Sequence, residues 1–189
     1  MGHKVRDLGE LIRGILALLG FAPVESLVLL LLGGGELVSV MRLDLAAATQ
    51  SGSPAELAEM VARQNADGVV AVVVSEEGTT CPMCGDQLRA MVDDVTSELE
   101  RRGNRMLDAV LVDRIKAGGR WSCLDRCGVG GVLDDPASSW LAAAAVADGR
   151  RMYGSRAELA ELVALDASRV AAVKPLLGVP AAVGSVAVS

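Results

Sequence analysis

The four cysteines of the chain fall into two close pairs, and they are the residues best suited to chemistry. The first pair is Cys81-Pro82-Met83-Cys84, and the second is Cys123-Leu124-Asp125-Arg126-Cys127. Two pairs of closely spaced thiolates match the all-sulfur, four-coordinate shell of a structural zinc site. Such a closed shell leaves no open position for a substrate, so the site is expected to be non-catalytic. The spacing therefore predicts one zinc ion bound by Cys81, Cys84, Cys123 and Cys127.

Thiol–disulfide exchange at the first pair is the main alternative. An apolar, β-branched run at 69–74 precedes Cys81, and a predicted helix follows it. A helix N-terminus lowers the pKa of a thiol and makes it more nucleophilic. Glutaredoxin-like and thioredoxin-like sites also place a cis-proline beside the disulfide, yet no proline lies between Pro82 and Pro136. A third interpretation is that the four thiols are simply packed, because cysteine is among the most buried residues.

Catalysis by histidine has little support in the sequence. The single histidine is His3, in a terminal segment that we expect to fray. Ser-His-Asp and Cys-His mechanisms therefore lack a base. Asp134-Asp135, before Pro136, can hold a metal or act in acid–base chemistry, and a turn explains the pair equally well. The prediction is a protein that is not an enzyme.

Charge and hydropathy exclude further classes. The chain carries 18 Lys and Arg against 24 Asp and Glu, a net charge of −6, so a broad nucleic-acid surface is not expected. The apolar runs at 27–32 and 69–74 are too short to span a membrane, and the stretch 15–22 lacks a signal-peptidase site. We therefore expect a cytoplasmic protein whose thiols stay reduced.

The elements that must position the cysteines follow from hydrophobic periodicity. Helices are predicted over 7–19, from Ser53 onward and over 84–102, and strands over 26–32, 36–45, 69–74, 106–115 and 120–123. Glycines 33–35 and the turn 116–119 predict two hairpins. The result is an α/β fold: a mixed sheet of about five strands, with a parallel centre, antiparallel hairpins at the ends and helices on its faces. We expect one domain over 1–189, with 1–6 and 173–189 as terminal arms.

The geometry that this fold gives the cysteines is specific. Cys81 should follow the carboxyl end of strand 69–74 after a flexible loop at 76–80. The hairpin that turns at 116–119 should pair Cys123 with about Val112. The two cysteine pairs then meet only if this hairpin overhangs the edge of the sheet.

Several segments resemble a known family. They are LALLGFAPVESLVL at 16–29, MRLDL at 41–45, GRWS at 119–122, LDD at 133–135, the paired serines 138–139 and AAAAVADGR at 142–150. In this order they resemble the actinobacterial domain-of-unknown-function family 4192, over roughly residues 8–165. The resemblance implies an actinobacterial or phage origin and an α/β fold, and it implies no activity. Members tend to have proline where this chain has Trp140, and the pair Cys81 and Cys84 is not general in the family, which suggests a specialised role.

Together these features predict a non-catalytic, zinc-binding regulatory or binding module. Such a module would be an adaptor that responds to zinc supply, for a protein or ribonucleoprotein partner such as the translation or proteolysis machinery. An exposed Trp140, near a helix start, would suit a contact with that partner.

Overall fold

The computed structural model describes residues 8–50, 52–162, 164 and 167–173. These residues fall into two units, one ending at Arg156 and the other beginning at Ala157. The first unit holds the sheet and all four cysteines. The second holds most of α7 (Arg156–Glu161) and all of α8 (Ala167–Val173). The predicted arm 1–6, with His3, lies outside the described residues, as does the predicted arm 173–189 apart from Val173, which ends α8. The single-domain expectation stays a prediction.

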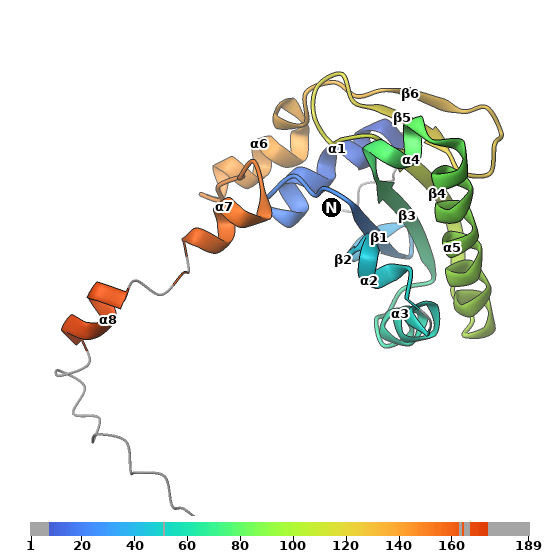
Figure 1. Ribbon diagram of the computed structural model, residues 1–189, viewed down its shortest axis with the longest axis horizontal. Coiled ribbons are helices and arrows are strands. Elements are labelled where there is room, and N and C mark those ends of the chain that lie inside the picture. Colours follow the sequence, from blue (N-terminus) through green and yellow to red (C-terminus); the bar gives the residue numbers. More distant parts are fainter. Residues whose placement is uncertain (1–7, 51, 163, 165–166, 174–189) are drawn as a thin grey trace, which may run out of the picture. The chain divides into compact units, whose positions relative to one another are not determined.

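The sheet of the first unit has six strands in the order β2-β1-β3-β4-β5-β6 (Figure 1). They are β1 (Ser26–Gly33), β2 (Glu36–Asp44), β3 (Gly68–Val74), β4 (Arg105–Val112), β5 (Arg120–Cys123) and β6 (Gly130–Val132). Within this sheet β3 and β4 pair in parallel, and the other four neighbouring pairs are antiparallel. The predicted mixed α/β sheet with hairpins at both ends is confirmed. The short β6 was not predicted, because Gly130 and Gly131 give no alternation of apolar and polar side chains.

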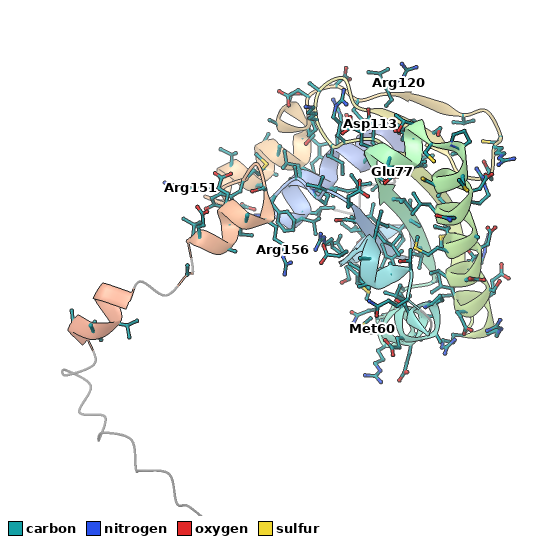
Figure 2. All side chains as sticks on the ribbon, viewed as in Figure 1. Met60, Glu77, Asp113, Arg120, Arg151 and Arg156 are labelled. Atoms are coloured by element: carbon teal, nitrogen blue, oxygen red, sulfur yellow. The ribbon has the colours of Figure 1, made fainter. Side chains whose placement is uncertain are left out.

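Helices cover both faces of the sheet. On one face α3 (Ser53–Ala62) and α5 (Pro82–Arg101) pack on alternate residues of β1 and β3. On the other face α1 (Leu8–Leu19) packs on the intervening residues of the same strands. Residues 27–32 of β1 and 69–74 of β3 are therefore apolar without interruption, as is typical of strands covered on both sides. Side chains on the outer surface of α3, such as Met60, point to solvent (Figure 2).

The helix stripe predicted for 84–102 is confirmed. All five apolar residues of that stripe are buried in α5: Leu88, Met91, Val92, Val95 and Leu99. The helix starts earlier than expected, with Cys81 as its N-cap and Pro82 in its first turn. Proline is suited to this place because its missing N–H would have no partner within the helix.

Two local predictions around the cysteines were wrong. Residues 76–80 are not a loop but a short helix, α4 (Glu76–Thr80), whose first turn is capped by Ser75: its Oγ accepts from the Gly78 N–H at 3.0 Å. Cys123 pairs with Val110 and not with Val112. The register differs by two residues because β4 ends at Val112, so the connection to β5 is longer than predicted.

The remaining helices of this unit are short. They are α2 (Leu45–Ala48), the 3-10 turn η1 (Pro136–Ser138) and α6 (Trp140–Ala147). Within the described part of the chain, no helix has the length and apolar character needed to cross a membrane.

Candidate functional site

The second cysteine pair and the aspartate between its members form one cluster of potential ligands. Cys123 ends β5, and Asp125 and Cys127 lie on the loop 124–129 that leads to β6. One ligand atom from each of the three residues lies within 4.8 Å of the other two. Cys123 is partly buried, while Asp125 and Cys127 are exposed. Thiolates and a carboxylate oxygen are all ligands that zinc accepts.

Backbone contacts hold this loop in its shape. Leu124 is buried against the core, and its N–H donates to the Ala109 carbonyl at 2.9 Å. The Cys123 N–H donates to the Val129 carbonyl, also at 2.9 Å, which closes the loop. At its tip Arg126 adopts a φ of +59°, a left-handed conformation that costs a non-glycine residue about 1 kcal/mol. The turn brings Cys127 back toward Cys123.

The electrostatics of the cluster differ between its members. Burial raises the pKa of the Cys123 thiol to about 11, and the hydrogen bond with Cys127 adds to this. The pKa of Asp125 is lowered because the Cys127 N–H donates to its carboxylate at 2.9 Å. Without a cation, Cys123 is therefore a neutral thiol at pH 7. A bound cation changes this, because a coordinating thiol is deprotonated.

The first cysteine pair lies at the start of α5 and forms a hydrogen-bonded dithiol. The Cys81 Sγ accepts from the Cys84 N–H at 3.3 Å, and the Cys84 thiol donates to the same sulfur. This shared hydrogen bond is the largest cause of two opposite shifts. The pKa of Cys81 is lowered, and the pKa of Cys84 is raised to about 12.

A carboxylate from α4 reaches the same dithiol. The Cys84 Sγ lies 3.5 Å from Oε1 of Glu77, which Figure 2 shows at the edge of the sheet where β3 ends. Glycines permit this approach of α4 to α5. A Cβ added to Gly85 would lie 2.8 Å from the Gly78 carbonyl oxygen, and a Cβ on Gly78 would lie 2.4 Å from Leu88. The two helices can pack this closely only without those side chains.

A chain of polar contacts links the two cysteine pairs. Asp86, two residues after Cys84, pairs with Arg126 and accepts from Arg89 at 2.8 Å. The Arg89 Nε also donates to the Leu124 carbonyl. Loop and helix border an open depression of about 370 Å³, into which Asp125 faces.

The structure groups the predicted ligands only in part. Among the described residues, which include every cysteine, the one cluster within 4.8 Å contains Cys123 and Cys127 but neither Cys81 nor Cys84. A zinc site with four thiolates stays a prediction, and it would require the two pairs to move together. Asp125 is a candidate ligand that was not predicted from the sequence, although its place midway between two cysteines was a usable signal.

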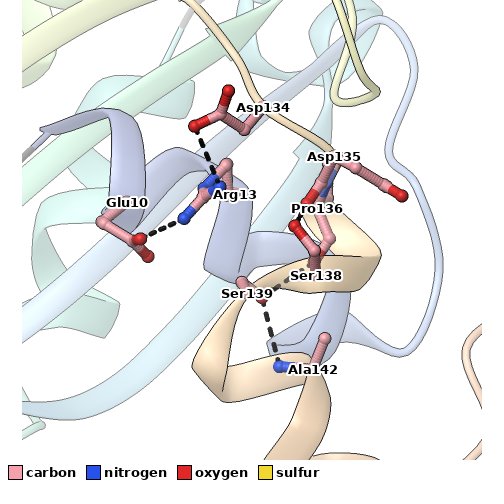
Figure 3. A network of polar contacts seen from close by, with 8 residues as sticks. All are labelled: Glu10, Arg13, Asp134, Asp135, Pro136, Ser138, Ser139 and Ala142. Carbon is pink, nitrogen blue, oxygen red and sulfur yellow. Dashed lines mark hydrogen bonds and ion pairs between the residues drawn. The ribbon is translucent and has the colours of Figure 1, made fainter.

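Asp134 and Asp135 lie in the connection between β6 and α6, and each has a structural partner (Figure 3). Asp134 pairs with Arg13 of α1 at 3.3 Å. The Asp135 carboxylate accepts from the Ala137 N–H at 3.0 Å and starts the η1 turn. The structure thus shows the turn that was one of the alternatives for this pair.

The predicted partner residue lies next to a helix cap. Ser139 caps α6, with its Oγ accepting from the Ala142 N–H at 3.2 Å (Figure 3). Trp140 begins the helix and is 48% exposed. Its predicted contact with a partner stays a prediction.

The chain matches a known protein-family model. The family model described as "Domain of unknown function (DUF4192)" matches residues 9–182, which is most of the chain. Comparison with curated proteins found no match, and neither did comparison with solved structures.

Proposed function

The chain belongs to the DUF4192 family, and we propose that this member is a non-catalytic metal-binding module that holds zinc through Cys123, Asp125 and Cys127. The observation that carries the proposal is the convergence of these three ligand atoms within 4.8 Å on one anchored loop. The actinobacterial origin that the resemblance implied stays a prediction.

The chemistry of the ligands favours zinc over the common hard cations. Two thiolates are soft donors, which select zinc, copper(I) or iron–sulfur clusters over magnesium and calcium. A carboxylate oxygen completes three protein ligands, and zinc takes a fourth in a tetrahedral shell. We propose a water or a donor from a partner in that fourth position. A four-thiolate site that includes Cys81 and Cys84 is the alternative, and variants of those two cysteines distinguish it.

Metal binding would restrict an exposed loop of the module. The cluster lies on a loop with exposed residues, including Val129 at 51%. Binding of an ion to ligands 123–127 would restrict this loop, because metal binding and local folding are coupled. In this proposal the restricted loop, with Trp140 elsewhere on the surface, contacts a protein or ribonucleoprotein partner in the cytoplasm, where thiols are reduced.

Zinc titration of the purified full chain, with a chromophoric chelator as competitor, tests the proposal. We expect one zinc per chain, and at least tenfold weaker binding in Cys123→Ser, Cys127→Ser and Asp125→Asn. Asp148→Asn, at an exposed carboxylate that follows α6 and is not part of the cluster, is the matched control and should bind as the parent chain does.

Two further variants decide the ligand set. Cys81→Ser and Cys84→Ser should keep zinc if the site has three protein ligands, and should lose it if four thiolates bind. If the parent chain binds zinc no more tightly than the double variant Cys123→Ser/Cys127→Ser, the metal proposal is wrong.

A further inference from the structure

We propose that Cys81 and Cys84 form a second, separate site that exchanges thiols with the disulfide of a protein substrate, with Cys81 as nucleophile, Cys84 as resolving cysteine and Glu77 as the acceptor of the Cys84 proton. None of the three proposed zinc ligands takes part in this chemistry. It rests on the geometry at the start of α5, where two sulfurs, one helix terminus and one carboxylate meet.

Cys81 occupies the position where negative charge is most favoured on a helix. It is the N-cap of α5, a helix of 20 residues, and its sulfur replaces the oxygen of a typical capping side chain. It accepts two hydrogen bonds from Cys84, one from the N–H at 3.3 Å and one from the thiol. The partial positive charge of the helix N-terminus further stabilises a thiolate there. Cys81 is therefore the attacking sulfur.

The surroundings of Cys81 suit a protein substrate. Pro82 and Met83 are both exposed, and Met83 is 70% exposed. A flexible, polarisable methionine beside the reactive sulfur can pack on varied apolar surfaces. Cys81 and Cys84 are themselves partly exposed, so a disulfide held in a partner protein can reach them.

Exchange would proceed in two balanced steps. The Cys81 thiolate attacks one sulfur of the substrate disulfide and forms a mixed disulfide with it. The substrate S–S bond breaks, and the other substrate sulfur leaves as a thiolate that takes up a proton from solvent. Cys84 then loses its proton and attacks the Cys81 sulfur. The mixed disulfide breaks, the second substrate sulfur leaves as a thiolate, and a Cys81–Cys84 disulfide forms. The substrate disulfide gains two electrons, and a dithiol reductant returns the pair to the reduced state.

Glu77 is needed for the second step. In the resting dithiol, the Cys84 thiol donates to the Cys81 sulfur. Once Cys81 is bound to substrate it carries no charge and is a much weaker acceptor. Glu77 Oε1, 3.5 Å from the Cys84 sulfur, is then the carboxylate in place to take the proton. The close contact between Gly78 and Gly85 keeps it there.

The experiment follows insulin disulfides as the protein probe, with a dithiol reductant and the purified full chain. The parent chain should accelerate insulin reduction, and Cys81→Ser should abolish the acceleration. Cys84→Ser should accumulate a mixed disulfide with insulin, which mass spectrometry detects. The double variant Cys123→Ser/Cys127→Ser is the matched control, because it also removes two thiols but leaves Cys81 and Cys84 in place. It should exchange at the parent rate.

Glu77→Gln separates the two steps. It should leave the rate of mixed-disulfide formation unchanged and slow the resolution of the mixed disulfide about tenfold at pH 7. The rate of resolution should recover at higher pH, where the Cys84 thiol loses its proton to solvent without help from a carboxylate. Glu77→Asp should restore part of the rate at pH 7. Equal resolution rates in Glu77→Gln and the parent chain at every pH would remove Glu77 from the proposal.

The outcomes for the metal and the dithiol are distinguishable. Exchange by the parent chain without zinc binding overturns the metal site alone. Zinc loss in Cys84→Ser, together with no insulin reduction by the parent chain, overturns the exchange activity and supports the four-thiolate site.

Discussion

Gly85→Ala is the substitution that tests how α4 and α5 create the dithiol site. The added Cβ would lie 2.8 Å from the Gly78 carbonyl oxygen. Non-bonded carbon atoms reach their optimal separation at about 3.5–4.0 Å, so the two helices must move apart by several tenths of an ångström. The obstacle is a backbone atom, and rotation of a side chain cannot relieve it.

Two effects of opposite sign determine how much the Gly85→Ala substitution changes the free energy of unfolding. Overpacking of this kind costs about 1–3 kcal/mol. Alanine in place of glycine within a helix gains at most about 1 kcal/mol. We therefore expect the free energy of unfolding to fall by about 1 kcal/mol, with a decrease in Tm of about 2–4 °C for a chain of this size.

Thermal and urea unfolding followed by circular dichroism measure this change. Gly14→Ala in α1 is the matched control, because its Cβ would meet only the flexible side chain of Leu141, with Cδ1 at 2.5 Å, and no backbone atom. It should be close to the parent chain in stability, or above it. Displacement of α4 should also carry Glu77 away from Cys84 and slow resolution of the mixed disulfide. A Gly85→Ala variant as stable as Gly14→Ala, with an unchanged rate of resolution, would show that close helix contact has no part in the site.

Zinc affinity should rise with pH between about 6 and 9, because the pKa of Cys123 is raised to about 11 and its proton must leave when the metal binds. The lowered pKa of Asp125 keeps that ligand ionised over the same range. Competition titrations at several pH values measure the affinity, and an affinity independent of pH would contradict the prediction. Ser139→Ala should destabilise the protein by about 1 kcal/mol through loss of the α6 cap, as urea unfolding would show, while Ser138→Ala should have a smaller effect. Leu99→Ala should cost about 2–5 kcal/mol, because this fully buried side chain would leave a cavity in the core; a loss below 1 kcal/mol would contradict the packing described.

The sequence predicted the parts of this fold that have a strong hydrophobic period. The stripe of α5 and the strands β1 and β3 bury apolar side chains at regular intervals, so their type follows from their pattern. α4 could not be found in this way. Its residues Glu-Glu-Gly-Thr-Thr have weak helix propensity, and the helix depends on the Ser75 cap and on packing between Gly78 and Leu88.

The site was predicted less completely than the fold. The spacing of the cysteines identified the pairs, but it could not give the distance between them, which depends on the register of β5 and on the path of a loop. Asp125 was overlooked because it was treated only as a spacer between two thiols. Its hydrogen bond to the Cys127 N–H is a property of the folded loop.

The ion pair between Asp86 and Arg126 has a consequence for regulation. If both proposals hold, oxidation of the dithiol and zinc binding at the loop each act on one end of this bridge, so each event should change the equilibrium constant of the other by the same factor. Both side chains are largely exposed, and an exposed pair contributes at most about 1 kcal/mol, which limits that factor to about five. A coupling of this size would adjust the response of the protein to oxidant and to zinc together, as a graded adjustment and not as an all-or-none switch.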